Sequence, residues 1–244
     1  MKKIIRYKNL IKSILNEVYF NKRVGADIFI PPKVNYIYDI GANKGDYTYR
    51  YLQKSKKVLS IEPQKHLYLL LIVRFFRNIL QRQLTIKKIA ISDKKDIVDF
   101  FLPEKWHQLG TISKEYTQES RFKDMNWNKV KRVKTTTLDA LIEKYGMPDY
   151  IKIDIEGNEI KALNGLNSFP KILSLEANID DYSKIVEMLE IVSKNYKYFN
   201  FIKETSTTLE FDNTIELQQL KKFLKSYKNE YTHAWGDIYC YLDK

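Results

Sequence analysis

The chain has 244 residues, of which 44% are hydrophobic and 30% charged, and its formal net charge is +12. This length and composition predict one full-sized domain with a sizeable core. The single cysteine, Cys240, excludes an intrachain disulfide framework. The longest apolar run, residues 67–73, is far shorter than the ~20 residues needed to span a bilayer, so we expect a cytoplasmic protein that reaches a membrane only peripherally.

The first 33 residues predict a basic helical segment that precedes the domain. Residues 1–23 carry seven Lys or Arg side chains and one acidic residue, a net charge of +6 that is half of the total. Apolar residues recur there at helical spacing and predict an amphipathic helix: Leu10, Ile11, Ile14, Leu15 and Val18. We favour a helix that packs on the domain. The alternative is peripheral contact with an anionic membrane through residues 1–23.

From residue 34 onward, strand-like and helix-like patterns alternate. The strand patterns cover 36–40, 57–61, 84–91, 150–155, 171–176, 198–203 and 236–242, and the helical patterns cover 44–54, 64–82, 137–145, 157–165, 181–194 and 215–227. This alternation predicts a doubly wound α/β domain over residues 34–244, with a mostly parallel seven-stranded sheet and an antiparallel edge.

The turn after the first strand predicts a cofactor site. The stretch Asp39-Ile40-Gly41-Ala42-Asn43-Lys44-Gly45 lets the backbone turn tightly before a helix with free N–H groups. The spacing of a dinucleotide site would need glycines at 43 and 46, where the chain has Asn43 and Asp46. The site is therefore not obviously one for a nicotinamide or flavin dinucleotide.

The next two strands add residues that suit a nucleoside. Glu62 follows the second strand about twenty positions after the glycine turn, where a carboxylate accepts hydrogen bonds from ribose hydroxyls. Ala90 and Ile91, near the end of the third, are small and apolar and can bracket an adenine.

Carboxylates gather where the strands at 150–155 and 171–176 end. Asp154, Glu156 and Glu159 fall within six residues, and Glu176 and Asn178 reach the same rim. Like charges raise one another's pKa, so the cluster predicts proton transfer, a polar pocket or a bound cation. Glu159 is explained by the positive N-terminus of the next helix. A divalent cation such as Mg²⁺ is the less favoured reading, because three oxygens on a rim do not define a metal site.

Between these strands lies a long segment, 103–129, without a clean period. Residues 97–102 predict an extra strand before it, and it carries Trp106, His107 and Trp127. Loops of this length usually act as lids or binding segments, so we expect a lid-like insertion over the substrate.

Taken in order, these segments resemble the FkbM-like family of class I S-adenosylmethionine-dependent methyltransferases. The matching stretches are YDIGANKGDYT (38–48), SIEPQ (60–64), IAISD (89–93), VKTTTLDALI (133–142), YIKIDIEGNEIKAL (150–163) and LSLEAN (173–178). The resemblance implies a Rossmann-like class I methyltransferase fold with S-adenosylmethionine as the cofactor. It implies that the methionine part of the cofactor is surrounded by Asp39, Gly41, Asn43 and Gly45. It also implies that Glu62 binds the ribose and that Ala90 and Ile91 flank the adenine. Asp154 would face both cofactor and substrate.

The resemblance also implies methyl transfer to a hydroxyl of a sugar, a polysaccharide precursor or a natural product. A hydroxyl needs a proton acceptor as it attacks, and we predict Asp154 or Glu156 for this role, with His107 as the alternative. The basic charge is compatible with an acidic glycan or small-molecule acceptor.

Two other functions stay open. Basic and aromatic residues alternate in RFKDMNWNKVKRVK (121–134), a pattern that suits RNA contacts, although the chain lacks the Asn/Asp-Pro-Pro-aromatic tetrapeptide of amino-nitrogen methyltransferases. The chain could also be an inactive module that binds S-adenosylmethionine, but its intact glycine turn, Glu62 and Asp154 argue against this.

Overall fold

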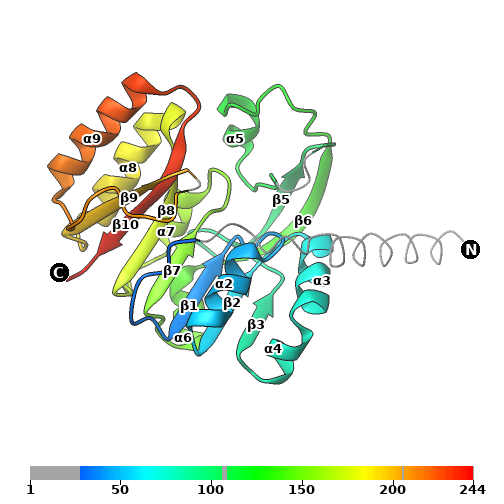
Figure 1. Cartoon of the computed structure of the whole chain (residues 1–244). Coiled ribbons are helices and arrows are strands. Elements are labelled where there is room, and N and C mark those ends of the chain that lie inside the picture. The colour runs from blue at the N-terminus through cyan, green and yellow to red at the C-terminus, as the bar shows by residue number, and fades with distance from the viewer. Residues whose placement is uncertain (1–27, 106–108, 205, 244) are drawn as a thin grey trace, which may run out of the picture.

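A computed structural model describes residues 28–105, 109–204 and 206–243 and places a seven-stranded sheet at their centre (Figure 1). The strand order is β3-β2-β1-β7-β8-β10-β9. These strands are β1 (Tyr36–Ile40), β2 (Lys57–Ile61), β3 (Leu84–Lys87), β7 (Tyr150–Ile153), β8 (Ile172–Asn178), β9 (Tyr198–Lys203) and β10 (Trp235–Tyr241). Neighbours pair in parallel except that β10 runs antiparallel to β8 and β9. The predicted α/β fold with an antiparallel edge is confirmed.

Helices cover both faces of this sheet, because successive strand residues point to opposite sides. On β1, Ile37 belongs to a core cluster with residues of α2 and α3, whereas Tyr38 belongs to one with residues of α6, α7, α8 and α9. The helices are α2 (Asp46–Lys54), α3 (Lys65–Arg74), α4 (Phe76–Leu80), α6 (Leu138–Tyr145), α7 (Glu159–Asn164), α8 (Tyr182–Val192) and α9 (Leu217–Glu230), with a short 3₁₀ helix, η1 (Ile179–Asp181), before α8.

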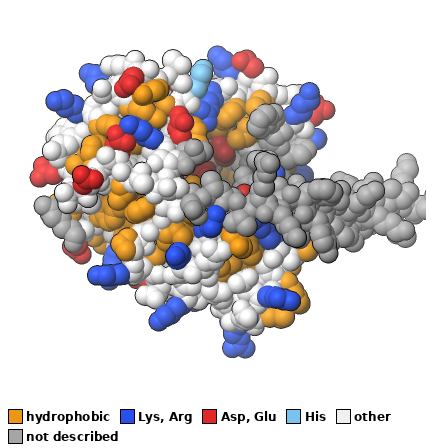
Figure 2. All heavy atoms as spheres, in the orientation of Figure 1, with side chains coloured by type: hydrophobic (Ala, Val, Ile, Leu, Met, Phe, Trp, Pro, Cys, Tyr) orange, Lys and Arg blue, Asp and Glu red, His pale blue; other side chains and the backbone are white. Residues whose placement is uncertain are grey.

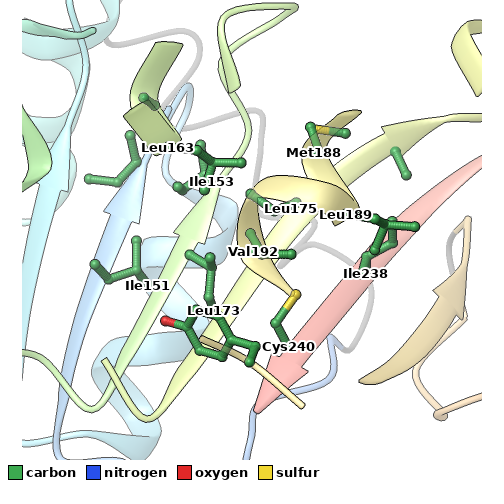
Figure 3. Packing of buried hydrophobic residues seen from close by; sticks show 14 of the residues in the cluster. Ile151, Ile153, Leu163, Leu173, Leu175, Met188, Leu189, Val192, Ile238 and Cys240 are labelled. Atoms are coloured by element: carbon green, nitrogen blue, oxygen red, sulfur yellow. The ribbon is translucent and has the colours of Figure 1, made fainter. Parts of the chain in front are cut away.

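The larger cluster fixes the position of the strands that carry the carboxylates. Figure 3 shows aliphatic side chains of β7, β8 and β10 packed against α8: Ile151, Ile153, Leu173, Leu175 and Ile238 meet Met188, Leu189 and Val192. These side chains are at most 4% exposed. Cys240 is buried in the same layer, so its thiol is part of the core.

A second, three-stranded sheet, in the order β4-β6-β5, forms beside the first. It consists of β4 (Ala90–Ile91), β5 (Ile97–Leu102) and β6 (Lys129–Thr136). The expected single strand over 84–91 was wrong, since β3 ends at Lys87 and β4 joins the other sheet. The strand β6 was not predicted, because five of its first six residues are exposed and it lacks an apolar run.

Two helical expectations also need correction. The helix expected over 64–82 breaks at Phe75, which caps α3 and begins α4. The segment 103–129, expected to lack regular structure, contains the short helix α5 (Lys114–Glu119).

Most of the basic segment at the start of the chain lies outside the described residues, including Leu10, Ile11, Ile14, Leu15 and Val18. Residues 28–33 are described and are extended chain and a turn rather than helix. Ile28, Phe29 and Ile30 pack against the smaller core cluster. Within the described residues, no helix is both long and apolar enough to span a membrane.

We expect Gly41→Ala to destabilise the protein much more than Gly146→Ala. Both glycines have a positive φ, 87° and 92°, which costs another residue about 1–3 kcal/mol. A Cβ at Gly41 would in addition overlap the carbonyl oxygen of Asp154, whereas a Cβ at Gly146 would meet nothing within 4 Å. Such overlap adds about 1–3 kcal/mol. Urea unfolding of the two variants measures the difference, and equal losses would contradict it.

Candidate functional site

A pocket opens where β1, β2, β4 and β7 end, on the side of the sheet predicted for a cofactor. We call it the cofactor pocket, and its lining includes Gly41, Asn43, Glu62, Gln64, Ala90, Ile91, Asp154, Glu156 and Asn158. Thr111 and Ile112 of the long segment also line it. The structure thus brings together six of the eight residues predicted to bind the cofactor.

Glu62 is held in this pocket by two backbone donors. The N–H groups of Asn43 and Gln64 donate to its Oε2 and Oε1, at 3.0 and 2.7 Å. Burial raises the pKa of Glu62 to about 8, although these two N–H groups work in the opposite direction. The carboxyl group is therefore fixed in direction and has lost most of its water. A ligand that donates hydrogen bonds to this carboxyl group would replace the hydrogen bonds with water that burial has removed.

Two more acceptors face the same pocket. Gln64 and Asn158 are 4% and 2% exposed, and their side-chain carbonyl oxygens have no hydrogen-bond partner among the described residues. The Asn158 amide donates to the Ile91 carbonyl at 2.7 Å, which ties α7 to β4. Unsatisfied buried acceptors are rare in folded proteins. These two fit a ligand rich in N–H and O–H donors, as the amino groups and ribose of S-adenosylmethionine are.

Asp39 and Gly45 lie beneath the pocket and do not line it. Asp39 is completely buried and accepts a hydrogen bond of 2.5 Å from the Thr48 hydroxyl of α2. Gly45 precedes α2 with φ of 87°, where a Cβ would meet Leu71 and Phe75 of α3 and its cap. Both residues therefore support the turn from below.

Lys152 is a buried cation beside the same turn. It lies opposite Asp39 in the pairing of β1 with β7, and its Nζ donates to Asp154 at 2.7 Å. Its ammonium also lies 4.2 Å from the centre of the Tyr47 ring. Burial alone would lower the pKa of Lys152, but the negative groups around it, Asp154 first, raise that pKa well above its usual value. Lys152 therefore stays charged and balances the acids.

A second pocket meets the first at Glu156. We call it the acceptor pocket, and its lining includes Leu109, Tyr116, Arg121, Glu156, Glu159, Glu176, Asn178, Lys184 and Trp235. It lies between the long segment, α7, β8 and α8. Glu156 is thus the carboxylate that lines both pockets.

Glu156 is the best-anchored member of the carboxylate cluster. The Tyr116 hydroxyl of α5 donates to its Oε2, and the Thr111 hydroxyl donates to its carbonyl oxygen at 2.7 Å. Burial and the charge of Asp154 raise the pKa of Glu156 to about 8, while the Tyr116 donor opposes that rise. Its φ of 54° is in the left-handed region, and a backbone held in that region is common at functional sites.

The carboxyl groups of Asp154, Glu156 and Glu176 lie close together. Each brings a carboxylate oxygen to within 4.8 Å of the others. Burial, and then the charge of Asp154 and Glu156, raises the pKa of Glu176 well above its usual value. Glu156 and Glu176 are close enough to share protons, and oxygens at the spacing of all three carboxyl groups are also the ligands that a hard cation would use.

Other predicted residues have different places. Glu159 is the first residue of α7 and accepts from the N–H groups of Ile155 and Gly157, in the turn before that helix, at 3.0 and 3.3 Å. Trp127 donates to the Phe122 carbonyl and packs edge-on against Tyr116. His107 and Trp106 lie outside the described residues, so a role for His107 stays a prediction.

The sequence analysis missed several residues of the site. Tyr116 and Thr111 lie in the segment without a period, where no pattern marks them. Gln64 and Asn158 lie within the matched stretches 60–64 and 150–163, but neither was assigned a role. Lys152 lies in the strand that carries Asp154, and a lysine in a run of apolar residues is the signal that was available.

Comparison with known proteins agrees with this geometry. A family model described as Methyltransferase FkbM domain matches residues 39–202. The chain belongs to the FkbM methyltransferase domain family. The resemblance drawn from the sequence is confirmed, and membership implies S-adenosylmethionine as the cofactor. A search of curated proteins found no match.

Solved structures of related shape were also found. An FkbM methyltransferase from Methylobacillus flagellatus is 16% identical with a TM-score of 0.48, and the match covers 85% of this chain and 43% of that one. This chain thus spans less than half of that protein. An O-methyltransferase from Bacillus cereus in complex with S-adenosylhomocysteine is 11% identical with a TM-score of 0.45, covering 96% and 90%. Matches this distant do not bear on the acceptor.

We expect Lys152→Met to cost about 3–5 kcal/mol, because removing one member of a buried ion pair leaves the other charge uncompensated. The control Lys94→Met removes a lysine whose side chain is 72% exposed, which should change stability by no more than about 0.5 kcal/mol. Urea unfolding of both variants provides the comparison. A small loss of stability in Lys152→Met would show that burial of the surrounding acidic groups does not require this cation.

We expect Glu62→Gln to weaken binding of S-adenosylhomocysteine by about 10- to 100-fold, because one of the two carboxyl oxygens that accept hydrogen bonds is replaced by an amide donor. The new amide would also face one of the two backbone donors. Calorimetric titration measures the affinity. Asp93→Asn, which neutralises an exposed acid after β4, serves as the control and should bind as the unaltered protein does. Equal affinity in all three proteins would remove Glu62 from the binding site.

Proposed function

We propose that this protein transfers a methyl group from S-adenosylmethionine to a hydroxyl oxygen of a sugar, polysaccharide precursor or hydroxylated natural product. The observation that carries the proposal is the position of Glu156, which lines both the cofactor pocket and the acceptor pocket. A base at this junction meets the acceptor where it approaches the cofactor. Family membership supports the methyl donor, and the acceptor atom is the inference.

The chain's own residues would divide the work between binding and proton transfer. Glu62, Gln64 and Asn158 offer acceptors to the cofactor, which when bound supplies an electrophilic methyl group. Glu156 takes the proton of the acceptor hydroxyl. Its raised pKa suits this task, because a base works best when its pKa is near the working pH. The Tyr116 hydroxyl donates a hydrogen bond to Oε2 of Glu156, so the carboxyl group keeps one orientation.

Asp154 is the weaker candidate for the base. Its Oδ2 is already paired with Lys152 at 2.7 Å, so this oxygen is less available to an acceptor hydroxyl. Asp154 instead lines the cofactor pocket and helps to keep the pKa of Glu156 high. We therefore propose Asp154 as a positioning and charge-setting residue.

The acceptor pocket favours a neutral polyol over an acidic substrate. Carboxyl groups of Glu156, Glu159 and Glu176 line it, and Arg121 and Lys184 are the cations among its lining residues. Lys184 already lies 3.3 Å from Glu115 and 3.9 Å from Asp181. An acidic acceptor would meet more acidic than basic side chains, whereas hydroxyls can form hydrogen bonds with these carboxyl groups.

The RNA alternative is weakened by the packing of the 121–134 segment. Its aromatic residues Phe122 and Trp127 pack against Tyr116 of α5, with ring centres 6.1 and 6.2 Å apart. Rings engaged in this way are not available for stacking on bases. The basic residues of β6 remain on the surface, but charge without aromatic platforms does not distinguish RNA from other polyanions.

We expect Glu156→Gln to lower kcat by about 10²- to 10⁴-fold, the usual contribution of a positioned general base, while affinity for S-adenosylhomocysteine changes little. Release of S-adenosylhomocysteine during incubation with hydroxylated acceptors measures turnover. Glu119→Gln, which changes another exposed acid of α5, is the matched control and should turn over normally. Near-normal turnover in Glu156→Gln would move the base to Asp154 or His107.

We expect activity to rise with pH, to reach half of its maximum near pH 8 and to level off above it, since a base is active only when it is deprotonated and the pKa of Glu156 is raised to about 8. Tyr116→Phe removes the donor that stabilises the charged form of Glu156. The pKa of Glu156 should therefore rise further, and the profile should move to higher pH. Profiles of kcat/KM for both proteins test this, and a shift to lower pH would contradict it.

A further inference from the structure

The surface formed by α3 and α4 combines exposed apolar side chains with unbalanced positive charge. Val73, Phe76 and Leu80 are 45%, 57% and 66% exposed. Phe76 and Leu80 are four residues apart and so lie on the same side of α4, and no residue of α4 is buried. This helix therefore presents its apolar side to solvent. Exposed apolar groups that cluster in this way usually mark an interaction site.

The charge around these side chains has one sign. Residues 63–92 contain six Lys or Arg residues and no Asp or Glu. Arg74 pairs with Asp46 of α2 at 2.8 Å. Arg77, Arg82 and Lys88 are exposed and form no ion pair within the described part of the chain. Figure 2 shows hydrophobic and basic side chains together at the lower right, where α3 and α4 lie.

We propose that the α3–α4 surface docks on an anionic lipid bilayer. Phe76 and Leu80 would enter the boundary between headgroups and acyl chains, and Arg77 and Arg82 would stay among the anionic headgroups. Charge complementarity selects this occupant. Residues 1–23 of the same chain also carry a net charge of +6, which would add to the attraction to an anionic bilayer.

Docking in this place leaves the functional site accessible. The start of α3 reaches the cofactor pocket through Leu67, while α4 follows the opposite end of α3 (Figure 1). A bilayer at α4 would therefore hold the protein beside the membrane without covering either pocket. The inference does not depend on which acceptor is methylated.

Vesicle sedimentation of the full chain tests the proposal. The unaltered protein should bind vesicles of phosphatidylcholine with phosphatidylglycerol, bind poorly to phosphatidylcholine alone, and lose affinity as salt rises. The double variant Phe76→Ser/Leu80→Ser should bind at least about tenfold more weakly. The matched control is Ile97→Ser/Val130→Ser, since both residues are 50% exposed on the smaller sheet, and it should bind as before. Binding of S-adenosylhomocysteine reports that each variant is folded.

Two results would overturn the proposal. The first is that the unaltered protein does not bind anionic vesicles. The second is that the Phe76→Ser/Leu80→Ser variant binds these vesicles as tightly as the unaltered protein, which would assign binding to other basic residues.

A fluorophore attached at Leu80→Cys gives an independent measurement, because the native Cys240 is fully buried. Its emission should shift to the blue with anionic vesicles, while the same label at Val130→Cys should not respond. A blue shift without vesicles, with sedimentation as a dimer, would mean that a second copy covers the surface and would also overturn the proposal.

Discussion

The site depends on one buried positive charge. Lys152 is 2% exposed, lies opposite Asp39 on β1, and pairs with Asp154 just after its own strand. Asp237 of β10 also acts on it electrostatically, and burial raises the pKa of Asp237 to about 6 in spite of the lysine. An ammonium group is costly to bury unless acids surround it. Strands β1, β7 and β10 must therefore bring their acidic residues to the same place.

This constraint reaches the pockets through the backbone after β7. Asp154 is held by Lys152, its carbonyl oxygen sits against Gly41, and the next residues turn sharply at Glu156 and Gly157. A Cβ at Gly157 would overlap Tyr116, so the close approach of α5 requires a glycine there. The same turn thus closes the cofactor pocket on one side and anchors the long segment on the other. Glu156 is the point at which the two meet.

The sequence was sufficient for the fold and for the cofactor pocket because both depend on local patterns. Alternation of strand and helix predicted the sheet, and the glycine turn with Glu62 predicted the side on which the pocket opens. The glycine turn that begins at Gly41 is the clearest of these patterns, since the spacing of its glycines differs from that of a dinucleotide site. The strand and helix patterns and the glycine turn are each formed by residues that are close together in the chain.

Features that depend on distant contacts were not predicted. Tyr116 meets Glu156 across forty residues, and nothing near Tyr116 in the sequence marks that contact. The strand β6 was missed because most of its residues are exposed and it lacks an apolar run, and it is held by pairing with β5. Asp39 was expected beside the cofactor, but it is fully buried near the end of β1 and does not line the pocket. Tertiary packing decides each of these cases.

Thermal unfolding with and without S-adenosylhomocysteine, with NAD⁺ as the control ligand, tests the central claim most directly. Ligand at about 100 times its dissociation constant adds about 2.7 kcal/mol of stability, which for a domain of this size raises the midpoint by about 5–10 °C. The account predicts this rise with S-adenosylhomocysteine and none with NAD⁺. An unchanged midpoint at saturating S-adenosylhomocysteine, or an equal rise with NAD⁺, would contradict the assignment of the pocket.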